Sequence, residues 1–172
     1  GQGVCVHIPG QDMIPPKAKV VSFRIEERYG IAWIWMGAPE KADPALLPDI
    51  PQYGDDKWEL IEDGYQHHPS NYLNIVENLM DPSHTTFLHK QTIGNPAAAN
   101  VPVTMEKTEN YIVAYKWVEN SPPTPNDLAV RDFGDQTVDR GIFFYCYPPS
   151  ISRVDIITLP SGTERTEENF NN

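Results

Sequence analysis

The sequence predicts an α+β fold, in which one kinked helix precedes a series of antiparallel strands. Apolar residues recur at helical spacing over residues 71–80, and short strand-like runs rich in apolar and aromatic residues follow from Met105 onwards. Proline accounts for 17 of the 172 residues, which favours turns and edge strands over long helices. Strands that follow a helix, instead of alternating with helices, are typical of an α+β domain.

The first 50 residues are expected to be the end of one domain. Residues 19–36 predict two strands that turn at Arg28-Tyr29-Gly30, and apolar and polar side chains alternate in the first of them. The second of these strands is apolar on both faces and should be buried on both. Residues 38–53 are rich in Pro and Asp and are expected to be a linker. We therefore divide the chain into residues 1–50 and a second domain, residues 51–172.

A helical stretch in the second domain is interrupted at Asp81-Pro82. Ser70 is expected to cap a helix over residues 71–80. Because proline favours the first helical position, Asp81 should cap a second, short helix over residues 82–89. The other expected elements are a strand at 58–61, a small-residue loop at 94–102, a hairpin over 105–117 that turns at Glu109-Asn110, a Pro-rich loop at 121–127, and strands at 142–147 and 154–159 joined through 148–150.

Charge and composition exclude several classes of partner. The formal net charge of −11 would repel nucleic acid and anionic membranes, so we expect neither, although a basic redox partner could dock. There is no apolar run of about 20 residues and no signal peptide, which indicates a cytoplasmic protein. Cys5 and Cys146 are expected to be reduced thiols. The start at Gly1 and the stop soon after a strand-like run suggest an internal fragment.

The chemically informative segment runs from Asn78 to His89 and places Asp81 and His84 between them. Neutral imidazoles are good ligands for divalent iron, zinc or copper. On an ideal helix a spacing of five residues turns the second side chain by about 140° from the first, so both rings reach one metal only if the helix is irregular or ends near His89. The break at Asp81 makes this plausible. From spacing alone, a metal site and a set of structural polar residues both fit.

The pattern Asn-x-x-Asp-x-x-His-x-x-x-x-His resembles the mononuclear iron motif of Rieske oxygenase α subunits. Asn71-Tyr72 and residues 77–81 resemble the branch that contains vanillate O-demethylases and the dicamba and toluenesulfonate monooxygenases. Residues 30–37 and 42–44 resemble the end of the Rieske domain in that branch. This resemblance covers nearly the whole chain. It implies the end of a β-rich Rieske domain followed by a helix-grip-like catalytic domain with an antiparallel sheet, truncated at its C-terminus.

The resemblance also implies a role for each residue of the motif. His84 and His89 would be two ligands of a non-haem Fe(II) facial triad, whose carboxylate lies beyond residue 172. Asp81 would bridge His84 to a Rieske-cluster histidine of a neighbouring subunit, which implies a ring oligomer, usually a homotrimer. A helix-capping role for Asp81 is compatible with this. Asn78 would be a polar residue near the iron. Five other acidic residues are not assigned to the iron and are expected on turns or solvent faces: Asp127, Asp132, Asp135, Asp139 and Asp155.

Two further groups imitate metal ligands. A [2Fe–2S] Rieske cluster needs a Cys-x-His and a Cys-x-x-His pair. Cys5-Val6-His7 resembles the first pair, but no Cys-x-x-His follows, so the cluster ligands are expected outside the chain. His67 and His68 are adjacent, so on a strand they would point to opposite faces, and both are expected to be structural.

By resemblance, the parent protein is the oxygenase component of an aromatic monooxygenase that takes electrons from a reductase or ferredoxin. Its substrate is expected to be a small aromatic acid, oxidised by O-demethylation; hydroxylation of an aromatic methyl group or ring is the alternative. Outside the family, a zinc hydrolase or a non-enzymatic β-rich ligand-binding domain remains open, although no HExxH motif is present. Four aromatic residues could line an apolar pocket or belong to the core: Phe87, Tyr111, Tyr115 and Trp117.

Overall fold

A computed structural model describes residues 3–61 and 64–170 of the chain. The chain forms two compact units, Gly1–Leu60 and Ile61–Asn172. The turns that follow residue 50 stay with the first unit: the Tyr53 ring lies 5.3 Å from the Tyr29 ring, and the backbone N–H of Ile50 donates to the Tyr29 hydroxyl.

The first unit contains an antiparallel hairpin of β1 (Arg24–Arg28) and β2 (Ile31–Trp35), as predicted. Tyr29 and Gly30 form its turn, with φ angles of 59° and 67° that suit a two-residue hairpin loop. Two short 3-10 helices follow, η1 (Pro39–Lys41) and η2 (Pro44–Leu46). The expected burial of both faces of β2 is wrong here, because in the described part of this unit the hairpin has no second layer and leaves Ile31 and Ile34 exposed.

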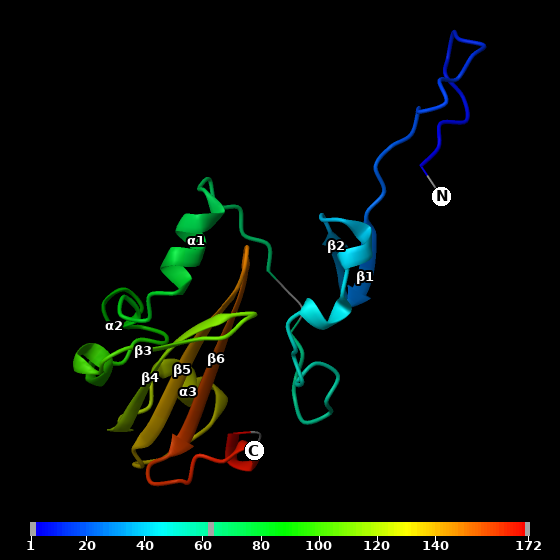
Figure 1. Ribbon diagram of the computed structural model, residues 1–172. Coiled ribbons are helices and arrows are strands. Elements are labelled where there is room, and N and C mark those ends of the chain that lie inside the picture. Colours follow the sequence, from blue (N-terminus) through cyan, green and yellow to red (C-terminus); the bar gives the residue numbers. More distant parts are fainter. Residues whose placement is uncertain (1–2, 62–63, 171–172) are drawn as a thin grey trace. The chain divides into compact units, whose positions relative to one another are not determined.

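The second unit is built on one antiparallel sheet (Figure 1). Its order is β3 (Thr104–Lys107), β4 (Ile112–Ser121), β5 (Val138–Tyr147) and β6 (Ile151–Pro160). The predicted hairpin and the predicted pair of later strands are both present, and β5 and β6 extend further than expected. Helices precede and interrupt this sheet, so the predicted α+β class is confirmed.

The helices of the second unit are short: α1 (Tyr72–Leu79), α2 (Thr85–Leu88), η3 (Pro96–Asn100), α3 (Pro125–Val130) and α4 (Glu167–Phe170). Asn71, not Ser70, caps α1, because the Asn71 carboxamide oxygen accepts the backbone N–H of Leu73. The predicted helix over residues 82–89 begins only at Thr85, after a turn. Among the described residues, no helix is long and apolar enough to cross a membrane.

Three sequence-based predictions of secondary structure are wrong. The small-residue loop expected at 94–102 contains η3. Residues 58–61 form no strand, because they have no neighbouring strand with which to pair. The Pro-rich segment predicted as a loop contains the start of α3. There the Thr124 hydroxyl accepts the backbone N–H of Asp127, and the Asp127 carboxylate accepts the backbone N–H of Thr124, which together form a capping box.

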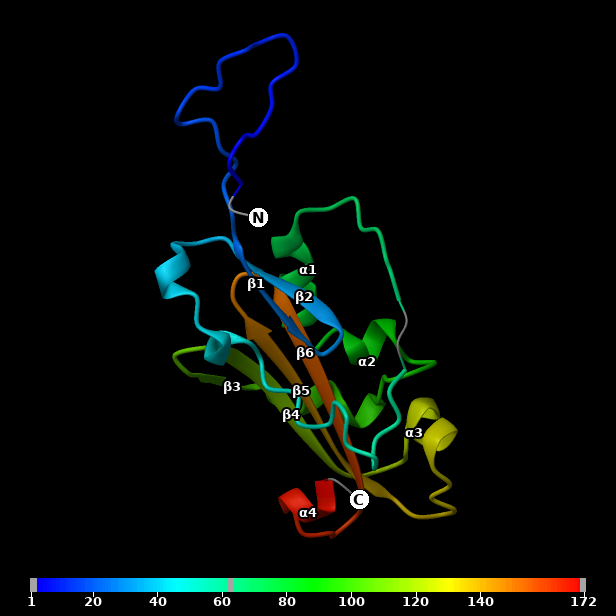
Figure 2. The ribbon, with the colours of Figure 1, turned by 90° about the vertical axis from the view of Figure 1, so that its right-hand side faces the viewer.

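The two faces of the sheet differ. We call inner face the one that carries Lys116 of β4, Arg140 of β5 and Thr158 of β6, which the strand register brings to the same side. η3 covers part of it, since the Lys116 ammonium donates to the Ala98 carbonyl at 3.2 Å, and α2 packs against η3. Figure 2 shows α2 and α3 on the same side of the sheet. The opposite, outer face carries most of the aromatic residues, which are listed here: Tyr115, Trp117, Phe143, Tyr145 and Tyr147.

Candidate metal centre

The two histidines of the motif converge. The centroids of the His84 and His89 rings lie 5.3 Å apart, with their planes at 67°. His84 precedes a helix of only four residues, and His89 leaves it with φ −111° and ψ 33°, so the ideal helical rotation between them does not apply. Since imidazole–metal bonds are about 2.0–2.1 Å long in zinc sites, rings at this separation can bind one ion between them.

Hydrogen bonding sets the tautomer of His84. Its Nδ1 lies 2.5 Å from the backbone carbonyl oxygen of Asp81. A carbonyl oxygen can only accept, so Nδ1 carries a proton, and in the neutral ring Nε2 then has the lone pair that a metal needs. The ring of His89 is exposed and makes no hydrogen bond within the described part of the chain, so either of its nitrogens can serve as a ligand.

The carboxylate of Asp81 has a different partner. Its Oδ1 accepts the backbone N–H of Ser83 at 2.9 Å and the Ser83 hydroxyl, while Oδ2 lies 3.9 Å from His84 Nδ1. The Ser83 hydroxyl bond, only partly opposed by burial, lowers the pKa of Asp81. The main-chain carbonyl of Asp81 is thus the nearer partner of His84, and the carboxylate lies further away. The carboxylate caps the turn before α2 and remains half exposed.

The described residues offer two candidate ligands and no third. No group of three His, Cys, Asp or Glu side chains that could hold a metal is found within residues 3–61 and 64–170. A facial triad needs one carboxylate besides two imidazoles. Asn78 lies on α1 with an exposed side chain, and its carbonyl accepts the backbone N–H of Asp81 at 3.4 Å.

The other cysteines and histidines do not assemble a site in the described parts of the chain. The Cys5 thiol contacts the carbonyl of His7 at 3.4 Å, and both cysteines are free thiols. His67 and His68 are exposed, and His68 Nε2 lies 3.2 Å from the side-chain oxygen of Gln66.

Two of the acidic residues expected on turns or solvent faces are buried instead. Asp127 is 8% exposed and joins the capping box of α3. Asp139 is equally buried on β5 and accepts the backbone N–H groups of Asn120 and Gly162. The spacing Thr124-x-x-Asp127 could have revealed the first, since it matches a capping box. Asp132 and Asp135 are exposed as expected.

The four candidate pocket aromatics do not gather at the histidine pair. Phe87 is exposed. Tyr115 and Trp117 alternate with Lys116 and therefore point to the outer face of the sheet. The ring of Tyr111 lies 5.5 Å from that of Tyr145, also on the outer face.

Comparison with known proteins places this geometry in a family. Residues 69–171 match the vanillate O-demethylase oxygenase C-terminal domain. The iron-sulfur subunit of a toluene-4-sulfonate monooxygenase system from Comamonas testosteroni is 33% identical, over 96% of this chain and 48% of its own length. A vanillate O-demethylase oxygenase subunit from Pseudomonas sp. (strain HR199 / DSM 7063) is 29% identical, over 94% of this chain and 46% of the relative.

Solved structures of dicamba monooxygenase have a similar fold. Dicamba monooxygenase bound to 3,6-dichlorosalicylic acid superposes with a TM-score of 0.82 and 28% identity, covering 96% of this chain and 48% of that one. The same enzyme with non-haem iron and dicamba gives a TM-score of 0.68, covering 95% and 46%. The chain thus spans about half the length of these relatives. The histidine pair, the antiparallel sheet and the match over residues 69–171 lead to one conclusion: the chain belongs to the vanillate O-demethylase oxygenase family of Rieske-type oxygenases and contains its C-terminal domain.

Proposed function

We propose that this chain is part of the oxygenase component of a Rieske-type aromatic monooxygenase, with non-haem Fe(II) bound by His84 and His89. The observation that carries the proposal is the convergence of the two rings, 5.3 Å apart, with Nδ1 of His84 held by the Asp81 carbonyl. Within this assignment, residues 1–50 are the end of the Rieske domain and residues 51–172 belong to the catalytic domain. The [2Fe–2S] ligands and the third iron ligand then come from outside this chain.

Bound Fe(II) with open coordination positions would supply the activation of O2. The residues of the chain orient and connect it. The Asp81 carbonyl holds the His84 ring so that Nε2 faces the metal. The Asp81 carboxylate is half exposed, so it can also accept an N–H from a Rieske-cluster imidazole. In this proposal that imidazole belongs to a neighbouring subunit of a homotrimer, and Asn78 lies near the iron from α1.

The proposed substrate is a small aromatic acid, and the proposed reaction is O-demethylation. Two electrons from a reductase or ferredoxin, two protons and O2 convert the methoxy carbon to a hemiacetal and release water; the hemiacetal then splits into a phenol and formaldehyde. Relatives named for vanillate, dicamba and toluene-4-sulfonate support this substrate class. The toluene-4-sulfonate relatives, which match 96% of the chain, favour hydroxylation of an aromatic methyl group as the second candidate. We place the protein in the cytoplasm.

Metal analysis of the full-length protein tests the iron site. His84→Ala should lose the mononuclear iron and keep the cluster absorbance, because only one imidazole would remain from this chain. His68→Ala is the matched control, since this histidine is exposed, its ring lies beside the Gln66 side chain, and the variant should keep all its iron. Unchanged iron in His84→Ala, or zinc in place of iron, contradicts the proposal.

The bridging role of Asp81 has its own test. Asp81→Asn keeps the main-chain carbonyl that orients His84, so both metals should stay bound. Turnover should be lost, because the amide cannot replace the carboxylate between the two centres. Normal turnover in this variant would exclude the bridging role without affecting the iron assignment.

A further inference from the structure

The end of α2 is held in a tight turn. The His89 carbonyl accepts the backbone N–H of Thr92 at 3.0 Å and that of Gly94 at 2.8 Å. Gly94 is required by close approach, since a Cβ there would lie 2.7 Å from the Thr85 oxygen and 2.8 Å from the His89 carbonyl carbon. The backbone position of His89 therefore depends on where this turn is placed.

Two parts of the second unit, distant in sequence, bind this turn. The backbone N–H of Asn126, at the start of α3, donates to the Thr92 carbonyl at 3.2 Å. Arg140, on the inner face of β5, reaches out with Nη1 to the Ile93 carbonyl at 3.4 Å. The segment that follows His89 is thereby tied to both α3 and the sheet.

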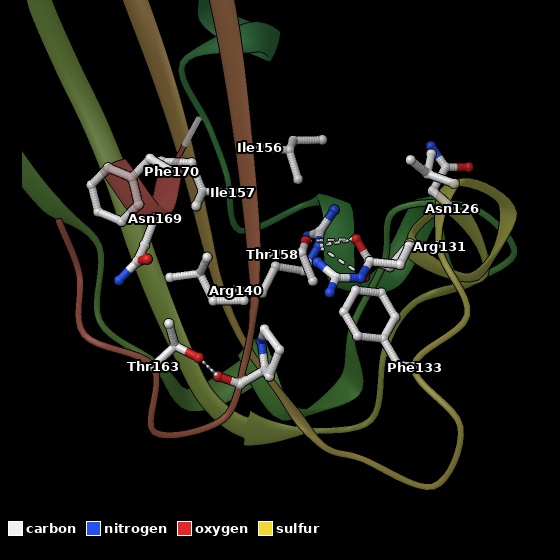
Figure 3. Close-up of a pocket in the computed structure, with 14 residues that line it drawn as sticks. Asn126, Arg131, Phe133, Arg140, Ile156, Ile157, Thr158, Thr163, Asn169 and Phe170 are labelled. Carbon is white, nitrogen blue, oxygen red and sulfur yellow. Dashed lines mark hydrogen bonds and ion pairs between the residues drawn. The ribbon is translucent and has the colours of Figure 1, made fainter. Parts of the chain in front are cut away.

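Arg140 is itself held by a buried carboxylate. Its Nε lies 3.2 Å from Asp127 Oδ2, and the two side chains are only 4% and 5% exposed. Thr158 donates to Asp127 Oδ1 at 2.8 Å, and Thr124 donates to Oδ2 at 2.6 Å. Figure 3 shows Arg140 beside Thr158, with dashed lines for the hydrogen bonds and ion pairs among the residues drawn. The guanidinium thus uses one edge for Asp127 and another nitrogen for Ile93, which a single lysine ammonium cannot do.

This buried ion pair is a weak source of folding stability. Burying two charges costs desolvation energy, and well-packed apolar residues of similar volume often stabilise a protein as much or more. Nη2 of Arg140 is also buried and has no hydrogen-bond partner in the described part of the chain. What the pair supplies that apolar residues cannot is a directional bond to the carbonyl beside the turn.

We infer that Arg140 and Asp127 are positioning residues for His89: their buried ion pair aims the guanidinium at the Ile93 carbonyl and so fixes the turn that sets the second iron ligand. The inference rests on the proposed function, because it assumes that His84 and His89 bind one metal. It assigns these two residues to the metal centre although they lie on the sheet and on α3, outside the motif.

The test measures Co(II) affinity by equilibrium dialysis, in full-length protein that keeps its Rieske cluster and lacks only the mononuclear iron, alongside the thermal unfolding midpoint. Arg140→Met should weaken Co(II) binding about 10- to 100-fold, as loss of a residue that orients a ligand usually does. Arg153→Met is the matched control: this arginine pairs with Asp155 at 3.0 Å on the outer face of the same sheet. It should lower the unfolding midpoint and leave Co(II) affinity unchanged.

The outcomes decide whether the pair of Arg140 and Asp127 positions His89 or only stabilises the fold. Wild-type Co(II) affinity in Arg140→Met, with a lowered unfolding midpoint, makes the pair purely structural and overturns the inference. If Arg140→Met does not fold, Arg140→Lys replaces it, because lysine keeps the charge beside Asp127 and loses the bond to Ile93; unchanged affinity in that variant also overturns the inference. His84→Ala runs in the same series, and wild-type affinity there refutes the proposed function itself.

Discussion

Two arginines of the sheet in the second unit, one on each face, pair with aspartates. The two pairs differ in how far they are exposed to solvent. Arg140 and Asp127 on the inner face are 4% and 5% exposed, whereas Arg153 and Asp155 on the outer face are 25% and 32% exposed. The outer pair is the shorter one, at 3.0 Å against 3.2 Å. The Arg153 guanidinium also lies 4.2 Å from the centre of the Tyr145 ring, so it makes a cation–π contact in addition to the ion pair.

The two carboxylates show what controls a buried charge. Burial raises the pKa of both, but the pKa of Asp127 is lowered in total because the bonds from Thr124 and Thr158 and the charge of Arg140 outweigh it. The pKa of Asp155 is raised, because burial prevails over the single partner Arg153. The number of hydrogen bonds to the carboxylate, and not the length of the ion pair, separates the two faces.

The largest expected effect is the removal of the inner carboxylate. Asp127→Ala leaves the Arg140 charge buried and should cost about 3–5 kcal/mol of unfolding free energy. Asp155→Ala on the outer face should cost about 1 kcal/mol or less, since its partner can reach solvent. Urea unfolding of the two variants checks this. Equal losses would show that hydrogen-bonded burial does not distinguish the pairs.

A smaller loss is expected from one donor of the inner carboxylate. Thr124→Ala removes the hydroxyl that caps α3 and donates to Asp127, and should cost about 1–2 kcal/mol. Thr124→Ser keeps the hydroxyl and serves as the control. If the two variants lose the same stability in thermal unfolding followed by circular dichroism, the methyl group of Thr124 matters and the hydrogen bond does not.

The two carboxylates should give opposite pH dependences of stability. Asp127 has a folded pKa below its unfolded value, so its contribution is present above the unfolded pKa and is lost as pH falls through the folded one. Asp155 binds its proton more tightly when folded, so its contribution declines as pH rises from the unfolded pKa to the folded one. Relative to the wild-type protein, Asp127→Asn should lower the slope of unfolding free energy against pH between about pH 3 and 7, and Asp155→Asn should raise it. Changes of slope in the same direction would contradict this assignment.

The smallest effect is expected at a surface pair on the outer face. Arg165 pairs with Glu119 and lies 4.3 Å from the centre of the Trp117 ring. Arg165→Met should cost about 0.5–1 kcal/mol, because a half-exposed cation over an aromatic ring is mostly solvated. Tryptophan fluorescence during thermal unfolding measures it. A loss as large as that of Asp127→Ala would mean that the outer face carries the stability of the sheet.

Local patterns predicted the hairpins well, because strand alternation and turn residues act over a few positions. β3 and β4 meet around Glu109-Asn110 as expected, and β5 and β6 meet through Pro148–Ser150. Residues 58–61 were also predicted as a strand from their apolar residues, but no strand in the described part of the chain pairs with them. The same reasoning also overlooked α3, since prolines hid a capping box that begins at Thr124.

The sequence by itself determined which side chains are available to the proposed metal centre: His84 and His89, five positions apart after a proline break at Pro82. Only the tertiary structure decided which atom of Asp81 holds His84, and which of the distant aspartates is buried. The reason is one of range. Spacing and proline act on neighbouring peptide units, whereas the direction of a carbonyl and the burial of Asp127 depend on backbone angles and on contacts of α3 with Arg140 of β5 and Thr158 of β6.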